Sequence, residues 1–599
     1  MSKTKKKSAR NHGESGAQKF WFPAAAFGLC IVTFILFRPS PSDNRGYMRR
    51  PRGTITFNKD IAPIIFSRCS PCHHEGQSAP FNLLTYHDVE KRKKQIADLT
   101  QSGYMPPWLP EGDYGEFAND RRLTSEEKGL IEQWVQEGAR EGLSEELPQL
   151  PHWQGNWLLG NPDLVVTMPK PYLLGEQGTD VYRNFVLPVP IQTNRYVRAI
   201  ELAPGNSKIV HHAFIKVDAT GASRALEARE SEPGFPGMDA PAQMPDGQFL
   251  TWQPGKVPLP SPEGLAWRLQ KGSDLVLQLH MNRTGKAETI QSSVGLYFTD
   301  RAPTNSCFKL VLTSIAIDIP AGEQNHVIED SYVLPLDLDV LAVLPHAHYL
   351  AREMRGYAIL PEGVKKPLLL IRKWDFNWQG EYRYAQPVHL PKGTKLCLQF
   401  TYDNSTNNVR NPNTPPKRVL YGPQSADEMC ELWFQVLPRH KDELAMLEND
   451  YQRKMRNVFM AGALKRIRSN PADADAHCKL GLLLRAAGKK QEAWDHFQTA
   501  SIAKPEFDEP HVYMGEMHRL DNKLAEAQKE FETVLRLNPR NSRGYGNLGF
   551  VFAGQGRLLD AERCFRKALD LNPTDQMVKD ALEELTRIRQ QRAKGGSDE

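Results

Sequence analysis

Residues 538–573 read NPRNSRGYGNLGFVFAGQGRLLDAERCFRKALDLNP, and the pattern of this stretch recurs through the last quarter of the chain. An Asn-Pro or Lys-Pro pair begins at residues 470, 504, 538 and 572, a constant step of 34 residues. A fixed period of this length indicates stacked helical units rather than one globular core. Other residues follow the same step: Gly481, Gly515 and Gly549; Ala493, Ala527 and Ala561; Phe497, Phe531 and Phe565.

The repeat length and its residue types resemble those of tetratricopeptide repeats. In such a unit, small residues let two helices approach closely, and a Phe fills the gap between neighbouring units. We predict three repeats and a capping helix over residues 470–592, preceded by a linker helix over 441–469. The array would present a concave surface to a protein or polymer partner, and a purely structural role is the alternative.

The 599 residues are enough for three or more domains, and Lys plus Arg exceed Asp plus Glu by only five. This small excess argues against nucleic-acid binding. Much of it lies in a basic tail, residues 1–19, before the uncharged run FWFPAAAFGLCIVTFILF at 20–37. That run is long enough to cross most of a bilayer core. We predict an uncleaved single-pass membrane anchor and a linker over 38–52, with a cleaved signal peptide as the alternative.

Residues 53–145 contain the sequence Cys69-Ser-Pro-Cys72-His73. This spacing matches covalent c-type haem attachment, in which both thiols bond to the haem and the His becomes an axial iron ligand. A zinc knuckle or a redox dithiol is the alternative. Met105, in YMPPW, is the predicted second axial ligand unless it only packs.

The same segment is predicted to be a small all-α domain, with a helix that starts at Thr124 and has Glu127 as its capping-box partner. It resembles bacterial cytochrome c domains. Haem attachment of this type takes place outside the cytoplasm. The resemblance therefore implies an inner-membrane protein with most of its chain in the periplasm.

From residue 153 to 440 the chain consists of short β-rich runs such as NFVLPV, DLVLQLHM and FKLVLTSIAI, separated by Gly, Pro and Asn turns. This length and texture predict two all-β sandwich domains, over 153–302 and 303–440. His211, His212 and His280 lie in such runs. Adjacent residues of a strand point to opposite faces, so His211 and His212 can share one metal ion only at a bulge or a strand end. Otherwise one of them packs.

His346 and His348 lie two residues apart, so both side chains project from one face of a strand. Met429, in DEMCELWF, offers a soft thioether. Two imidazoles and a thioether select copper over zinc or iron. Three imidazoles suit either oxidation state of copper, so the other histidines would form a second site of different character.

The runs VHHAF, LQLHM, PHAHYL and DEMC, in this order, resemble the copper type II, ascorbate-dependent monooxygenases, which include the peptidylglycine α-hydroxylating and dopamine β-monooxygenases. The resemblance implies two jelly-roll-like sandwiches, each holding one copper, across a solvent-filled cleft. It assigns His211, His212 and His280 to an electron-transfer copper. It assigns His346, His348 and Met429 to the catalytic copper, where oxygen would be inserted into a C–H bond.

The resemblance also makes Cys397 a plausible disulfide partner for Cys430, with two reduced thiols as the alternative. The chain departs from the peptide-hydroxylating branch at two positions. Leu344 and Trp433 stand where that branch has the Arg and Tyr that grip a peptide carboxylate. Without the Arg clamp, a C-terminal glycine peptide is not the expected substrate, and the pocket is expected to be more apolar.

These expectations combine into a monooxygenase whose two coppers receive electrons from a respiratory donor through the fused haem. The haem would replace or supplement ascorbate or another small-molecule reductant. The substrates would be O2 and an organic molecule that the sequence does not identify. Two alternatives remain: an electron-transfer or copper-binding protein without oxygenase activity, and an assembly scaffold with redox-sensing domains.

Overall fold

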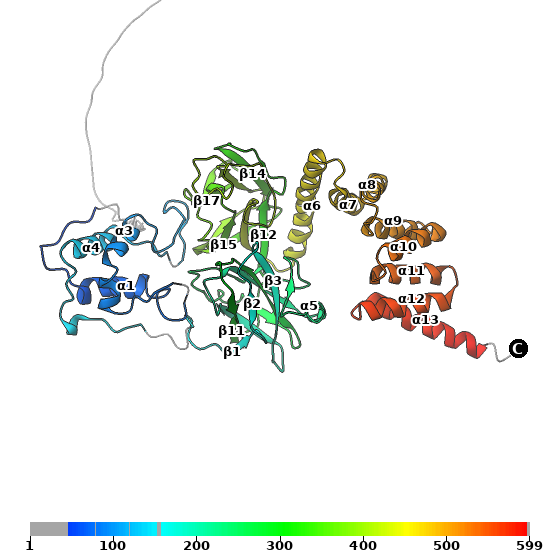
Figure 1. Cartoon of the computed structure of the whole chain (residues 1–599), viewed down its shortest axis with the longest axis horizontal. Coiled ribbons are helices and arrows are strands. Elements are labelled where there is room, and N and C mark those ends of the chain that lie inside the picture. The colour runs from blue at the N-terminus through cyan, green and yellow to red at the C-terminus, as the bar shows by residue number, and fades with distance from the viewer. Residues whose placement is uncertain (1–45, 78, 119, 152–156, 596–599) are drawn as a thin grey trace, which may run out of the picture. The chain divides into compact units, whose positions relative to one another are not determined.

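The computed structural model describes residues 46–595 except 78, 119 and 152–156 (Figure 1). In this part of the chain, no helix is both long enough and apolar enough to cross a bilayer. The predicted membrane anchor, residues 20–37, and the basic tail before it lie outside the described residues.

The first described segment folds into short helices around the almost fully buried Phe57, Ile65 and Trp134. The predicted helix start at Thr124 is confirmed: Glu127 N donates to Thr124 Oγ1 (3.1 Å), and Thr124 N donates to Glu127 Oε2 (2.7 Å). The elements are a π-helical turn at Phe57–Ile61, α1 (Ala62–Arg68), α2 (Tyr86–Glu90), α3 (Lys93–Gln101), α4 (Ser125–Gln136) and a 3₁₀ turn at Ser144–Glu146.

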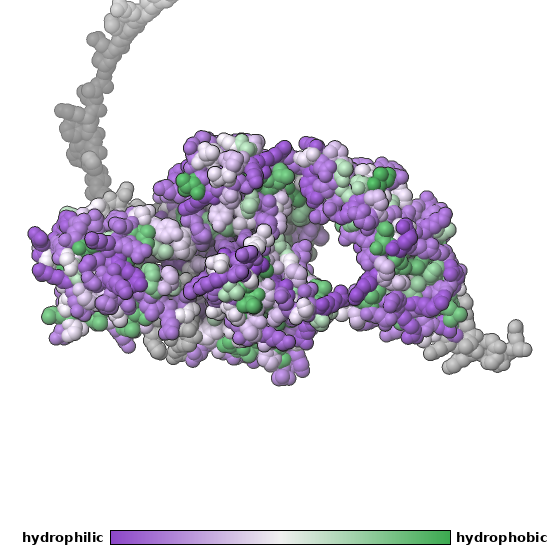
Figure 2. Space-filling view, in the orientation of Figure 1, coloured by the Kyte–Doolittle hydropathy of each residue, from purple (hydrophilic) through white to green (hydrophobic). Residues whose placement is uncertain are grey.

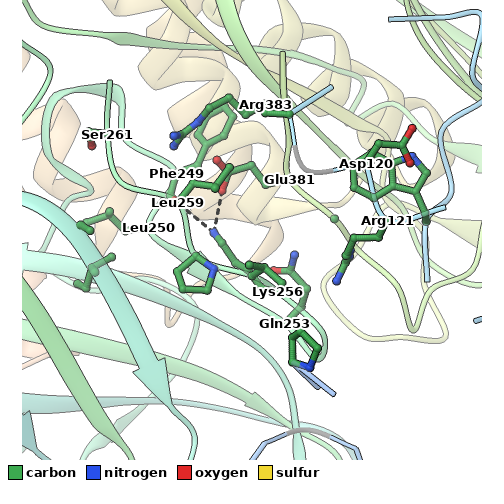
Figure 3. Close-up of a pocket in the computed structure, with 18 of the residues that line it drawn as sticks. Asp120, Arg121, Phe249, Leu250, Gln253, Lys256, Leu259, Ser261, Glu381 and Arg383 are labelled. Atoms are coloured by element: carbon green, nitrogen blue, oxygen red, sulfur yellow. Dashed lines mark hydrogen bonds and ion pairs between the residues drawn. The ribbon is translucent and has the colours of Figure 1, made fainter. Parts of the chain in front are cut away.

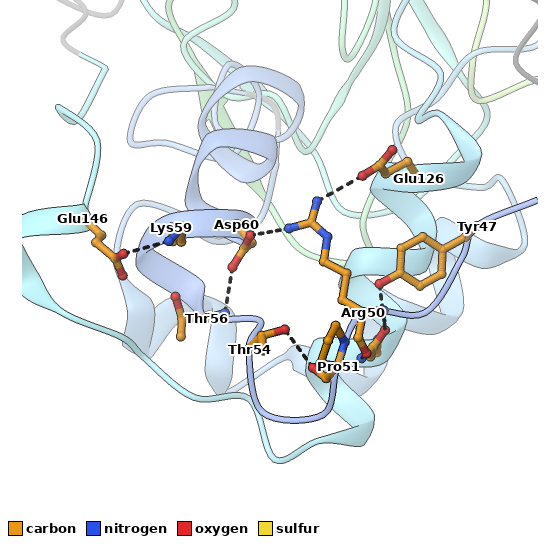
Figure 4. Close-up of polar contacts among 10 residues, drawn as sticks. Tyr47, Arg50, Pro51, Thr54, Thr56, Lys59, Asp60, Glu126 and Glu146 are labelled. Carbon is orange, nitrogen blue, oxygen red and sulfur yellow. Dashed lines mark hydrogen bonds and ion pairs between the residues drawn. The ribbon is translucent and has the colours of Figure 1, made fainter.

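A polar network ties the start of the described chain to α4 (Figure 4). Tyr47 Oη donates to Gln133 Oε1 (2.7 Å). Arg50 pairs with Asp60 (2.8 Å) and with Glu126 (3.0 Å). Partly exposed ion pairs contribute little stability each, so the network mainly orients the entering chain.

Residues 164–299 form β-sheets that share one apolar core. A four-stranded sheet has the order β1-β11-β4-β8, and a five-stranded sheet has the order β6-β3-β9-β5-β7. Strand β9 is buried along its whole length because it is the central strand of the larger sheet. The strands are β1 (Leu164–Thr167), β2 (Tyr172–Leu174), β3 (Val181–Pro188), β4 (Arg195–Ala203), β5 (Val210–Asp218), β6 (Phe235–Pro236), β7 (Thr251–Trp252), β8 (Trp267–Leu269), β9 (Asp274–Met281), β10 (Glu288–Ile290) and β11 (Ser293–Thr299), with the short helix α5 (Ala222–Glu227) and a 3₁₀ turn at Pro245–Gly247 between them.

Residues 308–438 form a second set of sheets with its own core. Two four-stranded sheets have the orders β12-β21-β15-β18 and β14-β19-β16-β17. The predicted β-rich middle region is therefore confirmed, and each half has a separate core. The strands are β12 (Phe308–Thr313), β13 (Asp318–Ile319), β14 (His326–Val333), β15 (Leu338–His346), β16 (Ala351–Ile359), β17 (Lys365–Ile371), β18 (Tyr382–Leu390), β19 (Lys395–Tyr402), β20 (Val419–Leu420) and β21 (Glu431–Pro438).

The C-terminal region is helical, as predicted. Each repeat is one helix pair, and its Phe is fully buried at positions 497, 531 and 565. The surface of these helices in Figure 2 is mostly hydrophilic. The helices are α6 (Glu443–Ser469), α7 (Ala474–Ala486), α8 (Lys490–Ala503), α9 (Glu509–Leu520), α10 (Leu524–Leu537), α11 (Ser542–Gly554), α12 (Leu558–Leu571) and α13 (Gln576–Gly595).

The repeated glycine is required by close helix packing. A Cβ added at Gly515 would lie 2.7 Å from the Phe531 ring, which has no room to move. We expect Gly515→Ala to lower the free energy of unfolding by about 1–3 kcal/mol, because overpacking forces backbone shifts. Lys529→Ala, at an exposed position of α10, is the control and should change little. Thermal unfolding of the full chain measures both, and equal stability of the two variants would refute the packing argument.

Candidate functional site

Three histidines of the first β unit, residues 164–299, converge where β5 and β9 pair. His212 is the direct partner of His280, and the register shifts between Val210 and His212. His211 is thus the extra residue of a β-bulge, the local geometry that adjacent histidines need to face one place. One ligand nitrogen of each of the three lies within 4.8 Å of the others.

The nitrogens of this trio suit a metal ion. His280 Nε2 donates to Asp180 Oδ2 (3.2 Å), and its Nδ1 lies 3.1 Å from His212 Nε2. The Nδ1 atoms of His211 and His212 are buried and have no hydrogen-bond partner in the part of the chain described. Burial lowers the pKa of His211 to about 3, against the opposing effect of a hydrogen bond to the Phe376 backbone. Buried, neutral and unpaired imidazole nitrogens fit copper.

Asp180 connects this trio to the second β unit, residues 308–438. Its Oδ2 accepts from Ser425 Oγ (2.5 Å) as well as from His280, and the hydrogen bond from His280 lowers the pKa of Asp180 to about 2. Tyr182 stacks on His280, with ring centroids 4.1 Å apart, and donates to the carbonyl of Pro423 (3.0 Å). The loop after β20 therefore contacts the residues around His280.

The second pair of histidines lies at the end of β15. His346 Nδ1 donates to Gln379 Oε1 (2.5 Å), and His348 Nδ1 donates to the carbonyl of Asp427 (3.1 Å). Burial lowers the pKa of His348 to about 3. Each ring is held through Nδ1 in a neutral tautomer, which leaves Nε2 as a possible metal ligand.

The backbone of Met429 is tied to the same segment by Glu428. The fully buried Glu428 carboxylate accepts hydrogen bonds from the amides of His348, Leu350 (3.0 Å) and Met429 (2.8 Å). Tyr402 Oη donates to the Met429 carbonyl (2.8 Å). Met429, which is 7% exposed, is therefore held next to the segment 346–348, although the two lie far apart in the sequence.

The predicted copper ligands form two ligand groups: the first is His211, His212 and His280, and the second is His346, His348 and Met429. The two groups adjoin one another. The ring centroids of His212 and His346 are 6.1 Å apart. Phe376 lies between the groups, stacked on His211 (4.2 Å) and edge-on to His348 (5.4 Å). The expected solvent-filled cleft does not separate the two groups at this point, because the His212 and His346 rings adjoin one another and Phe376 contacts both groups.

The expected Cys397–Cys430 disulfide is wrong, since both residues are free, buried thiols. Cys430 lies against Tyr402, to which it hydrogen-bonds, whereas the Cys397 thiol donates to the Lys395 carbonyl (3.6 Å). Cys397 and Tyr402 are five residues apart on β19, so they point to opposite faces and lie roughly 16 Å apart along the strand. The Met429 loop is held by Glu428 and Tyr402 instead.

The two positions that depart from the peptide-hydroxylating branch are direct neighbours. Leu344 of β15 is paired with Trp433 of β21, two positions before the pair that includes His346. Phe214 stacks on Trp433 and Phe249 meets it edge-on, both with ring centroids 6.0 Å away. Lys309 Nζ lies 4.4 Å from the Trp433 ring centroid. The contacts around Trp433 are therefore mainly aromatic and aliphatic, with one ammonium group against its ring.

All four predicted haem-binding residues line one cavity of about 280 Å³: Cys69, Cys72, His73 and Met105. His73 Nδ1 donates to the carbonyl of Phe81 (3.1 Å), which leaves Nε2 as a possible iron ligand. The lining is mainly apolar and includes Phe81, Leu83, Ile96, Leu99 and Pro106. The donor set and its surroundings fit a c-type haem.

Both β units complete the wall of this cavity. Pro254 and Gly255 come from the first unit, and Trp378 comes from the second. Arg121 donates to the carbonyls of Gly255 (2.5 Å) and Pro107 (3.1 Å). Residues 111–118 pair with the second unit through three backbone hydrogen bonds of 2.8 Å: Glu111 N to Leu370 O, Ala118 N to Arg383 O, and Ala385 N to Glu116 O.

A second cavity of about 380 Å³ adjoins the cavity lined by Cys69, Cys72, His73 and Met105, called the haem-type cavity below, and shares Arg68, Cys72 and Arg121 with it. Figure 3 shows Lys256 directed at Glu381, with which it forms a half-buried ion pair (2.7 Å). None of the six predicted copper ligands lines it. This cavity has a mixed polar and apolar lining and lies beside the predicted haem, not beside the histidines.

Sequence reasoning missed the residues that support the ligands. Asp180, Gln379 and Phe376 lie outside any motif, so no local signal could have found them. Glu428 was visible as the residue before Met429, but its role depends on a hydrogen bond to His348, 80 positions earlier.

Comparisons with known proteins match the C-terminal helices. A family model described as tetratricopeptide repeat matches residues 542–575. One similar solved structure is the first TPR of Spaghetti (RPAP3) bound to an HSP90 peptide (19% identity, 19% of this chain and 91% of that chain, TM-score 0.19). Another is pilF of Pseudomonas aeruginosa (21% identity, 23% of this chain and 64% of that chain, TM-score 0.22). No curated protein matches the chain. The comparisons therefore identify a tetratricopeptide repeat within the C-terminal helices.

Proposed function

We propose that this chain is a copper-dependent monooxygenase that hydroxylates a C–H bond of an organic substrate with O2. The observation that carries the proposal is the meeting of two imidazole groups, with His212 and His346 rings 6.1 Å apart, each with nitrogens available to a metal. The ligand types support copper at both: three imidazoles in one group, two imidazoles and a thioether in the other.

Copper at these positions would supply one-electron redox chemistry and the activation of O2. His211, His212 and His280 would hold the electron-transfer ion, and Asp180 orients His280. His346, His348 and Met429 would hold the catalytic ion. Gln379 and the Asp427 carbonyl fix the two imidazoles through Nδ1, and Glu428 holds the Met429 backbone beside His348. Such supporting contacts commonly tune metal affinity.

The substrate is proposed to be apolar near its reacting carbon. The wall beside His346 consists of Leu344, Trp433 and Phe214, with no guanidinium at the position of the carboxylate clamp. An apolar wall binds hydrocarbon by excluding water.

Electrons are proposed to reach the coppers from a covalently bound haem c, with Cys69 and Cys72 as its attachment points and His73 and Met105 as axial ligands. The shared cavity of these four residues supports this assignment. The donor would be respiratory, with ascorbate or another small reductant as an alternative. A periplasmic location with an inner-membrane anchor at 20–37 would allow both haem attachment and access to such a donor.

The repeats are proposed to bind a protein partner. Tetratricopeptide repeats commonly mediate protein–protein contacts, and the RPAP3 repeat was solved with an HSP90 peptide. The partner of this chain would be a periplasmic protein.

A second candidate function is electron transfer or copper binding without oxygenase activity. It is favoured by the side-chain packing between the two ligand groups, where the Phe376 ring contacts both His211 and His348.

Metal analysis and oxygen uptake separate the two candidates. We expect purified full-length protein to contain one haem and two coppers per chain, and to consume O2 while its reduced haem is oxidised. Full metal content without oxygen consumption would favour the electron-transfer candidate. A chain that binds no copper at neutral pH would contradict both.

A further inference from the structure

The cavity of about 380 Å³ beside the haem-type cavity has an excess of positive charge in its lining. Both carboxylates of the lining already have cationic partners. Glu381 forms an ion pair with Lys256 (2.7 Å), drawn as a dashed line in Figure 3, and Asp120 pairs with Arg122, which is outside the lining. The charged residues of the lining are the cations Arg68, Arg121, Lys256 and Arg383 and the carboxylates Asp120 and Glu381.

Two arginines of this lining have no counter-charge. Arg68 pairs with Glu127 (3.4 Å), whereas Arg121 and Arg383 donate only to backbone carbonyls. Neither of these two forms an ion pair within the part of the chain that the structure describes. Both are half-buried, so the attraction between each guanidinium and an anion is screened less than it would be in water. Two uncompensated guanidinium groups favour a ligand with two negative charges.

The same lining contains donors that lack an acceptor. Arg383 Nε and Trp108 Nε1 are buried, and neither has a hydrogen-bond partner among the described residues. Buried donors are nearly always hydrogen-bonded, so an unpaired donor in a cavity wall needs an explanation. A carboxylate supplies the missing acceptor, because its two oxygens match the paired N–H groups of a guanidinium.

The rest of the lining distinguishes an organic anion from an inorganic one. The volume lies in the range of small-molecule pockets. Several lining residues are apolar, and a carbon skeleton would cover them, whereas a phosphate or sulfate ion would leave them in contact with water. These residues include Phe249, Leu250, Val257, Leu259 and Trp267.

We propose that this cavity binds a small organic dicarboxylate, with one carboxylate at Arg121 and the other at Arg383. The inference goes beyond the proposed function and does not depend on copper. Arg121 belongs to the first segment and Arg383 to β18, so the bound molecule would link the first segment to the second β unit.

The two propionates of a haem are the competing source of carboxylates. In a porphyrin of this type, the propionates leave the ring at the edge opposite the carbons that bond to cysteine. The cavity shares Cys72 with the haem-type cavity and therefore adjoins the cysteine edge. We therefore favour a separate molecule.

Calorimetric titration of the full-length, haem-containing protein tests the site, with succinate and glutarate as probes in a buffer free of other carboxylates. We expect saturable binding of one dicarboxylate per chain. The melting temperature should rise with succinate concentration, because a ligand that binds only the folded state stabilises it. Arg383→Gln and Arg121→Gln should each weaken binding at least about tenfold, since each removes hydrogen bonds between charged groups.

Matched variants and ligands serve as controls. Arg301→Gln changes an arginine outside the cavity whose side chain is 81% exposed, and it should bind succinate as the wild type does. Arg383→Lys keeps the charge and should recover part of the affinity. Succinamide has the same carbon skeleton without charge and should not bind, and sulfate should not displace succinate. The melting temperature without ligand shows whether each variant is folded.

Each outcome decides the inference. Failure of the wild type to bind either dicarboxylate overturns it, as does unchanged affinity in a folded Arg383→Gln variant. Binding of succinamide overturns the charge argument, and displacement by sulfate overturns the organic class; both measurements use the wild type and need no folded variant.

A protein with Cys69→Ser and Cys72→Ser, which cannot attach haem, separates the two sources of carboxylates. Equal succinate binding with and without attached haem supports a separate molecule. Binding only in the double variant would show that the haem propionates fill the cavity. A wild-type protein without haem or copper overturns the proposed function, which metal analysis reveals independently of the titration.

Discussion

Met429→Ala is expected to abolish oxygen consumption while the haem and one copper remain bound. Met429 supplies the thioether of the second ligand group, and alanine leaves that group with two imidazoles. Loss of supporting contacts alone typically costs 10–100-fold in metal affinity or activity, so loss of a ligand should cost at least about 100-fold in oxygen consumption. Oxygen uptake with reduced haem and copper analysis of the same sample measure both effects.

Met446→Ala is the matched control for this prediction. Met446 lies on α6 and is 59% exposed, so its replacement removes a thioether from the chain without touching the site. It should consume oxygen as the wild type does. If Met429→Ala also consumes oxygen at the wild-type rate, the assignment of oxygen chemistry to that copper is wrong.

Glu428→Gln is expected to lower both the stability of the protein and the copper content of the second ligand group. Above pH 8 the ionised carboxylate accepts from three backbone amides, whereas an amide side chain would set its NH2 group against at least one of them, so the two proteins are compared there. A buried donor left without an acceptor costs about 1–3 kcal/mol. The same change loosens the segments that carry His348 and Met429. Chemical denaturation and copper analysis give the two readouts.

The pH dependence of stability distinguishes this role from simple packing. Burial raises the pKa of Glu428 to about 8, against the opposing effect of its three backbone hydrogen bonds. Between pH 4.5 and 8 the folded state then binds more protons at this group than the unfolded state, so its contribution to stability falls as pH rises. The metal-free wild type should show this fall and Glu428→Gln should lack it. Parallel pH profiles for the two proteins would contradict the assignment.

Several features of the fold could be predicted from local sequence signals. The 34-residue step predicted the helical repeats because each unit packs only against the units next to it in the sequence. Neighbours along the chain are therefore also neighbours in the structure. Thr124 and Glu127 predicted a helix start because a capping box is made within four residues. For His211 and His212 the sequence left a bulge, a strand end or a packing role open, and the structure has the bulge.

The failed expectations concern distances between segments far apart in the chain. The Cys397–Cys430 pairing was inferred by resemblance and failed because β19 directs Cys397 and Tyr402 to opposite faces. The expected solvent-filled cleft does not separate the two ligand groups where Phe376 packs between His211 and His348. Neither strand direction nor packing across the two β units is encoded in residue spacing.

By itself, the sequence determined the chemistry of the donors and their order along the chain: two thiols and a His in the first segment, imidazoles in the β units, and a thioether after them. Only the tertiary structure decided that His346 meets Gln379, that His280 meets Asp180, and that Trp378 closes the haem-type cavity. The physical reason is that side-chain type is a local property. Which side chains become neighbours depends on how sheets formed from distant strands pack together.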